Sequence, residues 1–102
     1  MATTWNLDKV KVYNTLEGNS DVIYLVNYVV VATDSNGGAY ALPKEATVDT
    51  SSITDFVPFA DLTKEVVLGW VTAGLGDNGV AAINQEAENA LSEYLNTSIK
   101  TL

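Results

Sequence analysis

The stretch Val22-Ile23-Tyr24-Leu25-Val26-Asn27-Tyr28-Val29-Val30-Val31-Ala32-Thr33 decides the fold of this chain. It is rich in β-branched and aromatic residues and contains neither glycine nor proline, so it favours a β-strand over a helix. At about 3.3 Å per residue such a strand spans roughly 40 Å, against a radius of gyration of about 13 Å for a domain of this length. We therefore expect the strand to bend, bulge or protrude.

Side chains of this strand alternate between two faces, and both faces are mostly apolar. One face takes Val22, Tyr24, Val26, Tyr28, Val30 and Ala32, and the other takes Ile23, Leu25, Asn27, Val29, Val31 and Thr33. A strand that is apolar on both sides needs cover on both sides. Helices of this chain supply one cover, and the second comes from a segment that folds back or, as we favour, from another chain. The predicted interface is therefore Ile23, Leu25, Val29 and Val31.

Turn residues on either side of this stretch predict two antiparallel hairpins. Residues 17–21 and 34–38 are rich in Gly, Asn, Asp and Ser, and Asn36-Gly37 supplies the positive φ angles of tight turns. A first strand is expected over residues 3–16. A third is expected from residue 39 through 42, either ending at Pro43 or resuming at 46–48, and the proline makes it an edge strand or a strand bulged at that point. Residues 49–55 are expected to form a loop.

The second half of the chain predicts two helices. Asp61 or Thr63 is a candidate N-cap for a helix that begins near Lys64, and glycines between residues 74 and 79 predict a stop. Apolar residues then recur at helical spacing from residue 78 to 96. The expected fold class is α+β: a three-stranded antiparallel β-meander followed by a helical hairpin packed on one sheet face, in a single domain of residues 1–102.

Cysteine and histidine are both absent from the chain. Their absence removes the thiolate nucleophile, the usual general base and the commonest zinc ligand. Thirteen carboxylates remain, but no spacing singles out a catalytic pair. We therefore expect a protein that is not an enzyme and that has no catalytic, cofactor-binding or metal-binding residues.

Five lysines oppose thirteen acidic residues, so the formal net charge is −8. Direct binding to nucleic acid or to an anionic membrane is not expected, because both depend on clusters of basic side chains. No membrane-spanning segment is expected either, since the longest wholly apolar runs fall well short of the roughly 20 residues that a helix needs. The acidic balance indicates solubility or, in a sharper interpretation, a basic partner.

Three further patterns have simpler interpretations than a functional one. The glycine spacing of residues 74–79 matches a dinucleotide fingerprint, but it follows a helix where that motif requires a strand. Oxygen ligands at Asp34, Asn36, Asp77 and Asn78 lack the complete loop of a calcium site and are expected to be turn residues. The aromatic residues are expected mainly in the core rather than in a stacking platform: Trp5, Tyr24, Tyr28, Phe56, Phe59, Trp70 and Tyr94.

Several short motifs resemble those of a family of small tailed-phage proteins. They are Val26-Asn27-Tyr28, Ala32-Thr33-Asp34, Ala39-Tyr40, the block Phe56-Val57-Pro58-Phe59-Ala60-Asp61-Leu62-Thr63 with Val67-Leu68-Gly69-Trp70-Val71, and then Leu75-Gly76, Val80 and Ile83. The resemblance covers roughly the whole chain, and the block from Phe56 to Val71 is its distinctive part. Residues 44–52 and the tail after Asn96 depart from the family pattern. The family has no characterised activity, so the resemblance carries no catalytic residue.

The resemblance implies a phage origin and a virion component or accessory assembly protein. Combined with the doubly apolar strand, it leads us to expect a non-enzymatic structural protein, such as a capsid decoration or tail-associated subunit. Its partners would be phage structural proteins or further copies of itself, met through the sheet face or the edge strands. It would reside in the virion, and in the host cytoplasm during assembly. The alternative is an acidic phage effector that blocks a basic site on a host protein.

Overall fold

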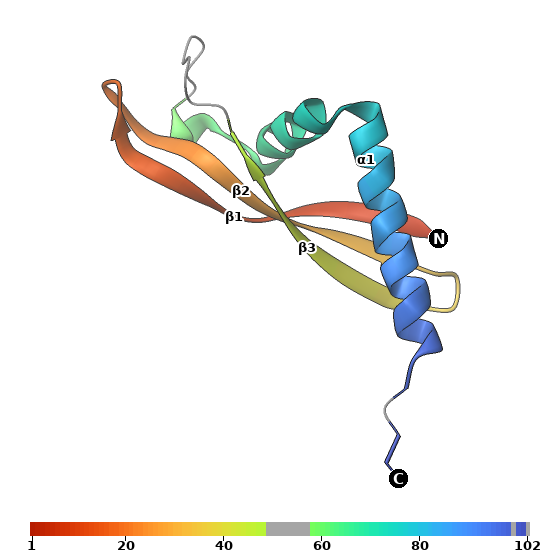
Figure 1. Cartoon of the computed structure of the whole chain (residues 1–102). Coiled ribbons are helices and arrows are strands. Elements are labelled where there is room, and N and C mark those ends of the chain that lie inside the picture. Colours follow the sequence, from red (N-terminus) through yellow and green to blue (C-terminus); the bar gives the residue numbers. More distant parts are fainter. Residues whose placement is uncertain (49–57, 99, 102) are drawn as a thin grey trace.

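The computed structural model describes residues 1–48, 58–98 and 100–101, and these residues form an α+β fold (Figure 1). Strands β1 (Ala2–Leu16), β2 (Asn19–Thr33) and β3 (Ala39–Thr47) make an antiparallel sheet in the order β1-β2-β3. A short 3-10 helix, η1 (Phe59–Asp61), and the helix α1 (Lys64–Asn96) follow, and α1 packs on one face of the sheet. The predicted fold class is confirmed. The loop expected over residues 49–55 and the start of the Phe-Val-Pro-Phe segment lie outside the described residues.

The two hairpin turns differ from each other in construction. Leu16 pairs with Asn19, so Glu17 and Gly18 are the two central residues, and their φ angles of 51° and 80° are those of a primed turn. In the second turn the Asp34 carboxylate accepts hydrogen bonds from the backbone N–H groups of residues 36 and 38, at 3.0 and 2.7 Å. Only Gly37 has a positive φ there, at 85°, so the expected Asn-Gly turn with two positive φ angles is replaced by an aspartate-centred loop.

β3 continues through Pro43 without the predicted interruption. Pro43 pairs with Val29 of β2, and among the described residues no strand pairs with the other side of β3. An edge strand tolerates proline, because the missing N–H need not remove a bond of the ladder. Of the two alternatives for the proline, the edge strand is confirmed, and β3 is continuous, with neither an interruption nor a bulge at Pro43.

Two β-bulges interrupt the long ladder between β1 and β2. Asp8 is the extra residue of β1, and Tyr24 is the extra residue of β2. A bulge bends its strand and increases the local twist. The molecule measures 60 × 31 × 21 Å with a radius of gyration of 17.0 Å, longer than the about 13 Å of a compact domain of this length. The expectation that the central strand bends or bulges is confirmed.

The bulge at Tyr24 overturns the predicted position of Ile23. Strict alternation places Ile23 on the same face as Leu25, but the extra residue between them reverses the alternation. Ile23 is 5% exposed and belongs to the hydrophobic core together with Val26. The prediction that Ile23 is an outward interface residue is wrong.

The core lies between α1 and the sheet face that α1 covers. Its buried members are Ile23, Val26, Tyr28, Val30, Ala32, Val67, Val71, Ala87 and Leu91. Trp5 of β1 completes this layer: its ring stacks on Tyr28 with the centroids 5.2 Å apart, and its Nε1–H donates to the side-chain oxygen of Asn84 on α1 at 2.7 Å. These contacts link all parts of the covered face to one helix.

α1 begins where the sequence predicts and is broken once. Thr63 is the N-cap, and its hydroxyl oxygen accepts a hydrogen bond from the Val66 N–H at 3.3 Å. Gly76, with φ 71° and ψ 173°, is the non-helical residue inside α1, and it separates a first arm (residues 64–75) from a second arm (77–96) that runs in a different direction (Figure 1). The predicted helical hairpin is replaced by a single bent helix, because one residue is too short a connection to reverse the chain.

Only part of each predicted apolar stripe on α1 is buried. Val67 and Val71 of the first arm and Ala87 and Leu91 of the second arm are in the core. Exposed large hydrophobic side chains of α1 are Val66, Trp70, Tyr94 and Leu95. The expectation that Phe59, Trp70 and Tyr94 lie mainly in the core is wrong, since all three are exposed. The bend lets each arm contact the sheet along a narrow line, and the rest of its apolar surface faces outward.

By length and composition alone, α1 is long and apolar enough to cross a membrane. The break at Gly76 divides that length into a first arm of residues 64–75, which rises by roughly 18 Å, and a second arm of residues 77–96, which rises by roughly 30 Å and carries Asp77, Glu86, Glu88 and Glu93. A hydrocarbon core is about 30 Å thick. Asp77 and Asn78 follow directly after the break, so the apolar surface is not continuous along the helix.

We expect Gly76→Ala to lower the free energy of unfolding by about 1–3 kcal/mol, because a φ of 71° with an extended ψ is accessible essentially to glycine alone. Gly74→Ala is the matched control: a Cβ at this position would meet nothing within 4 Å, and its φ is not positive. That substitution should leave stability unchanged or raise it by up to about 1 kcal/mol. Urea unfolding followed by circular dichroism measures both, and equal effects would contradict the assigned conformation.

Candidate functional site

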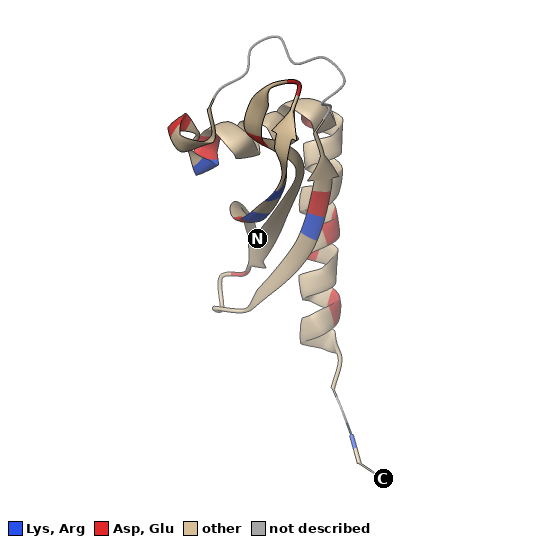
Figure 2. Ribbon diagram, turned by 90° about the vertical axis from the view of Figure 1, so that its left-hand side faces the viewer, with Lys and Arg blue, Asp and Glu red and all other residues tan. Residues whose placement is uncertain are grey.

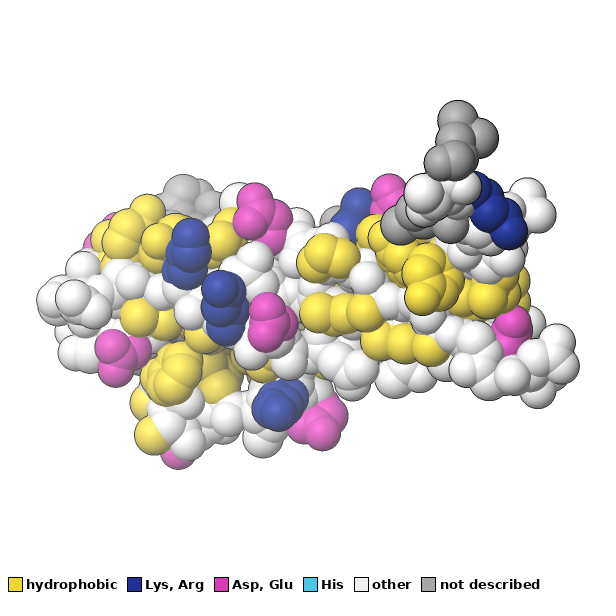
Figure 3. Space-filling model, turned by 90° about the horizontal axis from the view of Figure 1, so that it is seen from below, with side chains coloured by type: hydrophobic (Ala, Val, Ile, Leu, Met, Phe, Trp, Pro, Cys, Tyr) yellow, Lys and Arg dark blue, Asp and Glu magenta, His cyan; other side chains and the backbone are white. Residues whose placement is uncertain are grey.

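The sheet face opposite α1 carries an apolar row along the middle of β2. We call it the open stripe and define it as Leu25, Asn27, Val29 and Val31. All four side chains are half-buried, and the three apolar ones are not part of the core cluster or of the layer packed against it. Seen from below, this side of the molecule shows hydrophobic side chains in a broken row, with lysine and acidic side chains beside them (Figure 3). The described residues of this chain leave the open stripe uncovered.

Charged side chains flank the open stripe, positive on β1 and negative on β3. Residues directly opposite each other in an antiparallel ladder share a face. Asn27 pairs with Lys9 on one side and with Glu45 on the other, and Leu25 pairs with Lys11. Lys9, Lys11 and Glu45 are all exposed. A row across the sheet at the level of Asn27 therefore reads lysine, asparagine, glutamate.

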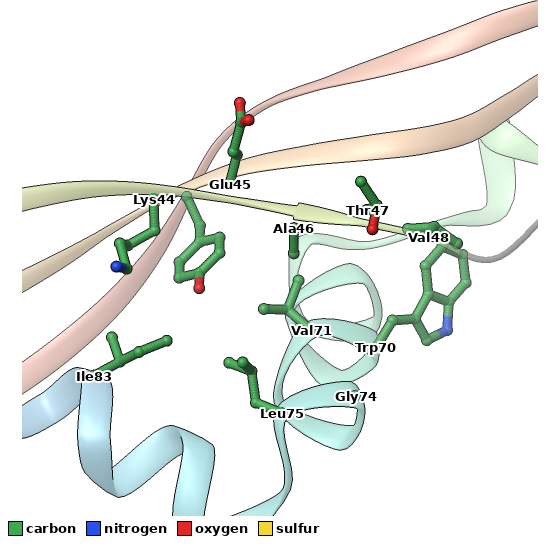
Figure 4. A pocket seen from close by; sticks show the side chains of 11 residues that line it. Lys44, Glu45, Ala46, Thr47, Val48, Trp70, Val71, Gly74, Leu75 and Ile83 are labelled. Atoms are coloured by element: carbon green, nitrogen blue, oxygen red, sulfur yellow. The ribbon is translucent and has the colours of Figure 1, made fainter.

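Neighbouring residues of β3 point to opposite sides of the sheet. Figure 4 shows Lys44 on the side of α1 and Glu45 on the other side of β3. Lys44 Nζ lies 2.8 Å from Glu86 Oε2 of α1, in a pair whose side chains are 30% and 51% exposed. An exposed pair of this kind contributes about 0.2–1 kcal/mol. Glu45 stays available on the open side.

Asn27 has an unsatisfied acceptor at the centre of the open stripe. Its side-chain oxygen is buried from water and has no hydrogen-bond partner among the described residues. Asn27 borders a shallow hollow together with Pro43, Lys44 and Glu45. An orphaned buried acceptor costs about 1–3 kcal/mol, so this residue is a local loss of stability for the isolated chain.

The open stripe ends at the β1–β2 hairpin. Tyr13 stacks on Tyr24 with ring centroids 4.4 Å apart, and Val22, the ladder partner of Tyr13, is 6% exposed. The open stripe therefore lies on the part of β2 beyond the bulge, toward Thr33, and the stacked pair of Tyr24 and the exposed Tyr13 borders it.

The structure places three of the four predicted interface residues on the uncovered face: Leu25, Val29 and Val31. The fourth, Ile23, is in the core. The flanking charges Lys9, Lys11 and Glu45 were not singled out from the sequence, because their common face depends on strand register and on the bulge at Asp8. Strand alternation places Asn27 on this face, but its missing hydrogen bond has no sequence signal.

A second feature is a pocket of about 680 Å³ between β3 and the bend of α1. It is lined by Tyr28, Lys44, Glu45, Ala46, Thr47, Val48, Trp70, Val71, Gly74, Leu75 and Ile83. Figure 4 shows Val71, Leu75 and Ile83 reaching from α1 toward β3, with Trp70 beside Val48 at one end. Its lining is mainly apolar, and no sequence pattern predicts it, because it exists only through the bend at Gly76.

Tyr28 is one of the residues that line this pocket. Burial raises the pKa of the Tyr28 hydroxyl above its ordinary value; the Lys44 ammonium opposes this rise, and the Glu86 carboxylate adds to it. The hydroxyl therefore stays protonated at neutral pH. A protonated phenol offers this pocket a hydrogen-bond donor rather than a general base.

Other candidates from the sequence have structural roles. Asp34 organises its turn, and Asp77 and Asn78 lie in α1 far along the chain from it. Within the described ranges no group of three or more Asp or Glu side chains is arranged to hold a metal ion. The glycine pattern of residues 74–79 lies inside α1 and includes its break.

Acidic side chains are distributed over several elements rather than gathered in one cluster (Figure 2). They occur at the first hairpin, in the second turn, on β3, in η1 and along α1. The second arm of α1 carries Asp77, Glu86, Glu88 and Glu93 and no basic residue. This arm is the most uniformly acidic part of the described chain.

A family model matches residues 1–101, and its description is "Domain of unknown function (DUF7936)". No curated protein and no solved structure matches the chain. The description names no activity, so the functional argument depends on the geometry above.

We expect the stability of the protein to fall as pH rises above about 10, the ordinary pKa of tyrosine, and Tyr28 to cause part of that fall. The pKa of Tyr28 is higher in the folded state than in the unfolded state. The stability that Tyr28 contributes is therefore fully present below the unfolded-state pKa and is lost as pH rises through the folded-state pKa. Tyr28→Phe should flatten the pH dependence of the unfolding free energy between about pH 9 and 11. A pH dependence as steep in Tyr28→Phe as in the wild type would refute the assignment.

We expect Asn27→Val to raise the free energy of unfolding by about 1–3 kcal/mol at dilute protein concentration, because it removes the orphaned acceptor and adds a β-branched residue to a strand. Asn6→Val is the matched control, since Asn6 is exposed on the same face and pairs with Val29. Chemical unfolding of both variants gives the comparison. A gain no larger for Asn27→Val than for Asn6→Val would show that Asn27 is satisfied in the isolated chain.

Proposed function

This chain belongs to the DUF7936 family, and we propose that it is a non-enzymatic structural or virion-associated protein of a tailed phage. Its role would be that of a capsid decoration protein or a tail-associated subunit. It would act by assembly with other phage structural proteins or with copies of itself, in the virion and, during assembly, in the host cytoplasm. The resemblance of the Phe56 to Val71 block to small phage proteins supports the phage origin.

The observation that carries the proposal is the open stripe. Leu25, Val29 and Val31 lie on the central strand, where a sheet is usually best covered, yet they are only half-buried. Burying apolar surface contributes about 25 cal/mol per Å². A protein surface laid over this row would gain that energy and would also exclude water from the Asn27 amide, so the face is better suited to a macromolecular partner than to a small ligand.

The composition also favours assembly over catalysis. The chain has no histidine, which is the most frequent general base, and no cysteine, which is a common covalent nucleophile. Burial raises the pKa of Tyr28, and this direction keeps its hydroxyl neutral. We therefore place the function in the shape and charge of the surface.

A second candidate is an acidic effector that blocks a basic site on a host protein. The uniformly acidic second arm of α1 is the observation that favours it. Glu86 on that arm already pairs with Lys44, and the remaining carboxylates are spread over several elements, so this proposal has less support. An effector of this kind would co-purify with a host protein in a salt-sensitive way and would be missing from particles.

The test is quantitative mass spectrometry of purified particles made with wild-type or variant protein. We expect wild-type protein in the particles and about tenfold lower incorporation of Val29→Ser, which corresponds to about 1.4 kcal/mol of lost contact energy. Val66→Ser is the matched control, because Val66 is an exposed valine on α1, away from the open stripe. Absence of the wild-type protein from particles would overturn the proposal; equal incorporation of both variants would show that the open stripe is not the assembly surface.

A further inference from the structure

We propose that the open stripe is the interface of a symmetric dimer of this chain, in which two sheets pack face to face about a two-fold axis parallel to β2. The inference rests on the proposed function, since it names a second copy as the occupant of the assembly surface. It is argued from the charges beside the open stripe, from Asn27 at its centre and from the area of the face.

The charge pattern across the face is complementary to itself. Lys9 and Lys11 lie on the β1 side of the open stripe, and Glu45 lies on the β3 side at the same level. Asp8, the bulged residue, is exposed next to Lys9 and offsets part of the positive charge of that flank. Two of the five lysines of an acidic chain are thus gathered on this one face. A partner with the reverse order of charges, negative over β1 and positive over β3, fits it.

A second copy supplies that reverse order in one orientation. Rotation by a two-fold axis parallel to β2 and lying between the two sheets places β1 of one copy over β3 of the other. Lys9 and Lys11 of each copy then face Glu45 of the other copy, twice over. Packed sheets are about 10 Å apart, a gap that a lysine and a glutamate side chain bridge together. An axis across the strands would instead set lysines over lysines, which costs energy.

Asn27 takes the central position in this arrangement. It is the polar residue of the open stripe, and the axis sets it opposite Asn27 of the second copy. A carboxamide both donates and accepts, so the two side chains can hydrogen-bond each other once their amides turn toward the axis, and the oxygen that has no partner among the described residues then gains one. A single polar pair within an apolar interface fixes register at some cost in stability. Asn27 would therefore select this alignment over slipped ones.

The size of the face makes the dimer a weak one. Nine residues of β2, from Leu25 to Thr33, extend roughly 30 Å, and three strands are roughly 14 Å wide, so the footprint is on the order of 400 Å² per copy. Stable complexes bury about 800 Å² per partner. We expect a dimer that forms at high protein concentration, or at the high local concentration of an assembled particle.

The experiment is sedimentation equilibrium of the full chain at concentrations up to about 1 mM, near the weak limit of specific affinities, with two charge-reversal variants. Lys9→Glu/Lys11→Glu makes both flanks of the open stripe acidic, and Glu45→Lys makes both flanks basic. We expect wild type to dimerise, each variant alone to associate at least about tenfold more weakly, and an equimolar mixture of the two to recover wild-type association as a mixed dimer. Glu45→Lys also reduces the net negative charge, so weaker association of this variant cannot come from overall repulsion.

Lys64→Glu is the matched control, because Lys64 is an exposed lysine at the start of α1, away from this face; it should dimerise like wild type. Unfolding curves of every variant verify that each one is folded. A wild-type monomer over the whole range would overturn the dimer, and so would a wild-type dimer that the flank reversals do not weaken, which would indicate edge-to-edge pairing. Protein that is monomeric yet present in particles would leave the proposed function intact, whereas a dimer missing from particles would refute that function alone.

Discussion

The packing of α1 on one side of β2 is the contact on which the rest of the structure depends. Val26 and Val30 of the strand and Ala87 and Leu91 of the helix are all fully buried, and they form the centre of the core. β2 is the middle strand, so β1 and β3 protect its edges while α1 protects one face. The described residues form one long helix, α1. That helix bends at Gly76 to follow the covered face, and the described chain provides no second layer for the other face.

The functional interpretation follows from this one-sided cover. An uncovered central strand with apolar side chains is costly in water, and such surfaces normally mark a place where another molecule binds. The charges beside it divide by strand, basic on β1 and acidic on β3, although the protein as a whole is acidic. Local charge order, not net charge, therefore determines which partner fits the face.

Asn27 illustrates how a single residue connects stability to assembly. Its oxygen has no hydrogen-bond partner among the described residues, a loss of stability that a valine at the same position would remove. Retaining a polar group in the middle of an apolar row is understandable where the group has a partner in the assembled state. In the pocket under the bend of α1, burial raises the pKa of the Tyr28 hydroxyl and keeps it neutral. The exposed ion pair between Lys44 and Glu86 connects β3 to the helix.

Local patterns in the sequence determined the secondary structure, the order of the strands and the existence of an apolar face beyond the reach of the helices. Strand propensity, the turn residues and the Thr63 cap are properties of a few neighbouring residues, so they are readable along the chain. The tertiary structure decided the rest: the bulge at Tyr24 turned Ile23 into the core, and the single break at Gly76 replaced a hairpin by a bent helix. It also placed Lys9, Lys11 and Glu45 on one face. These features depend on register and packing between residues far apart in sequence, where one extra residue reverses every later side chain and where no local pattern carries the information.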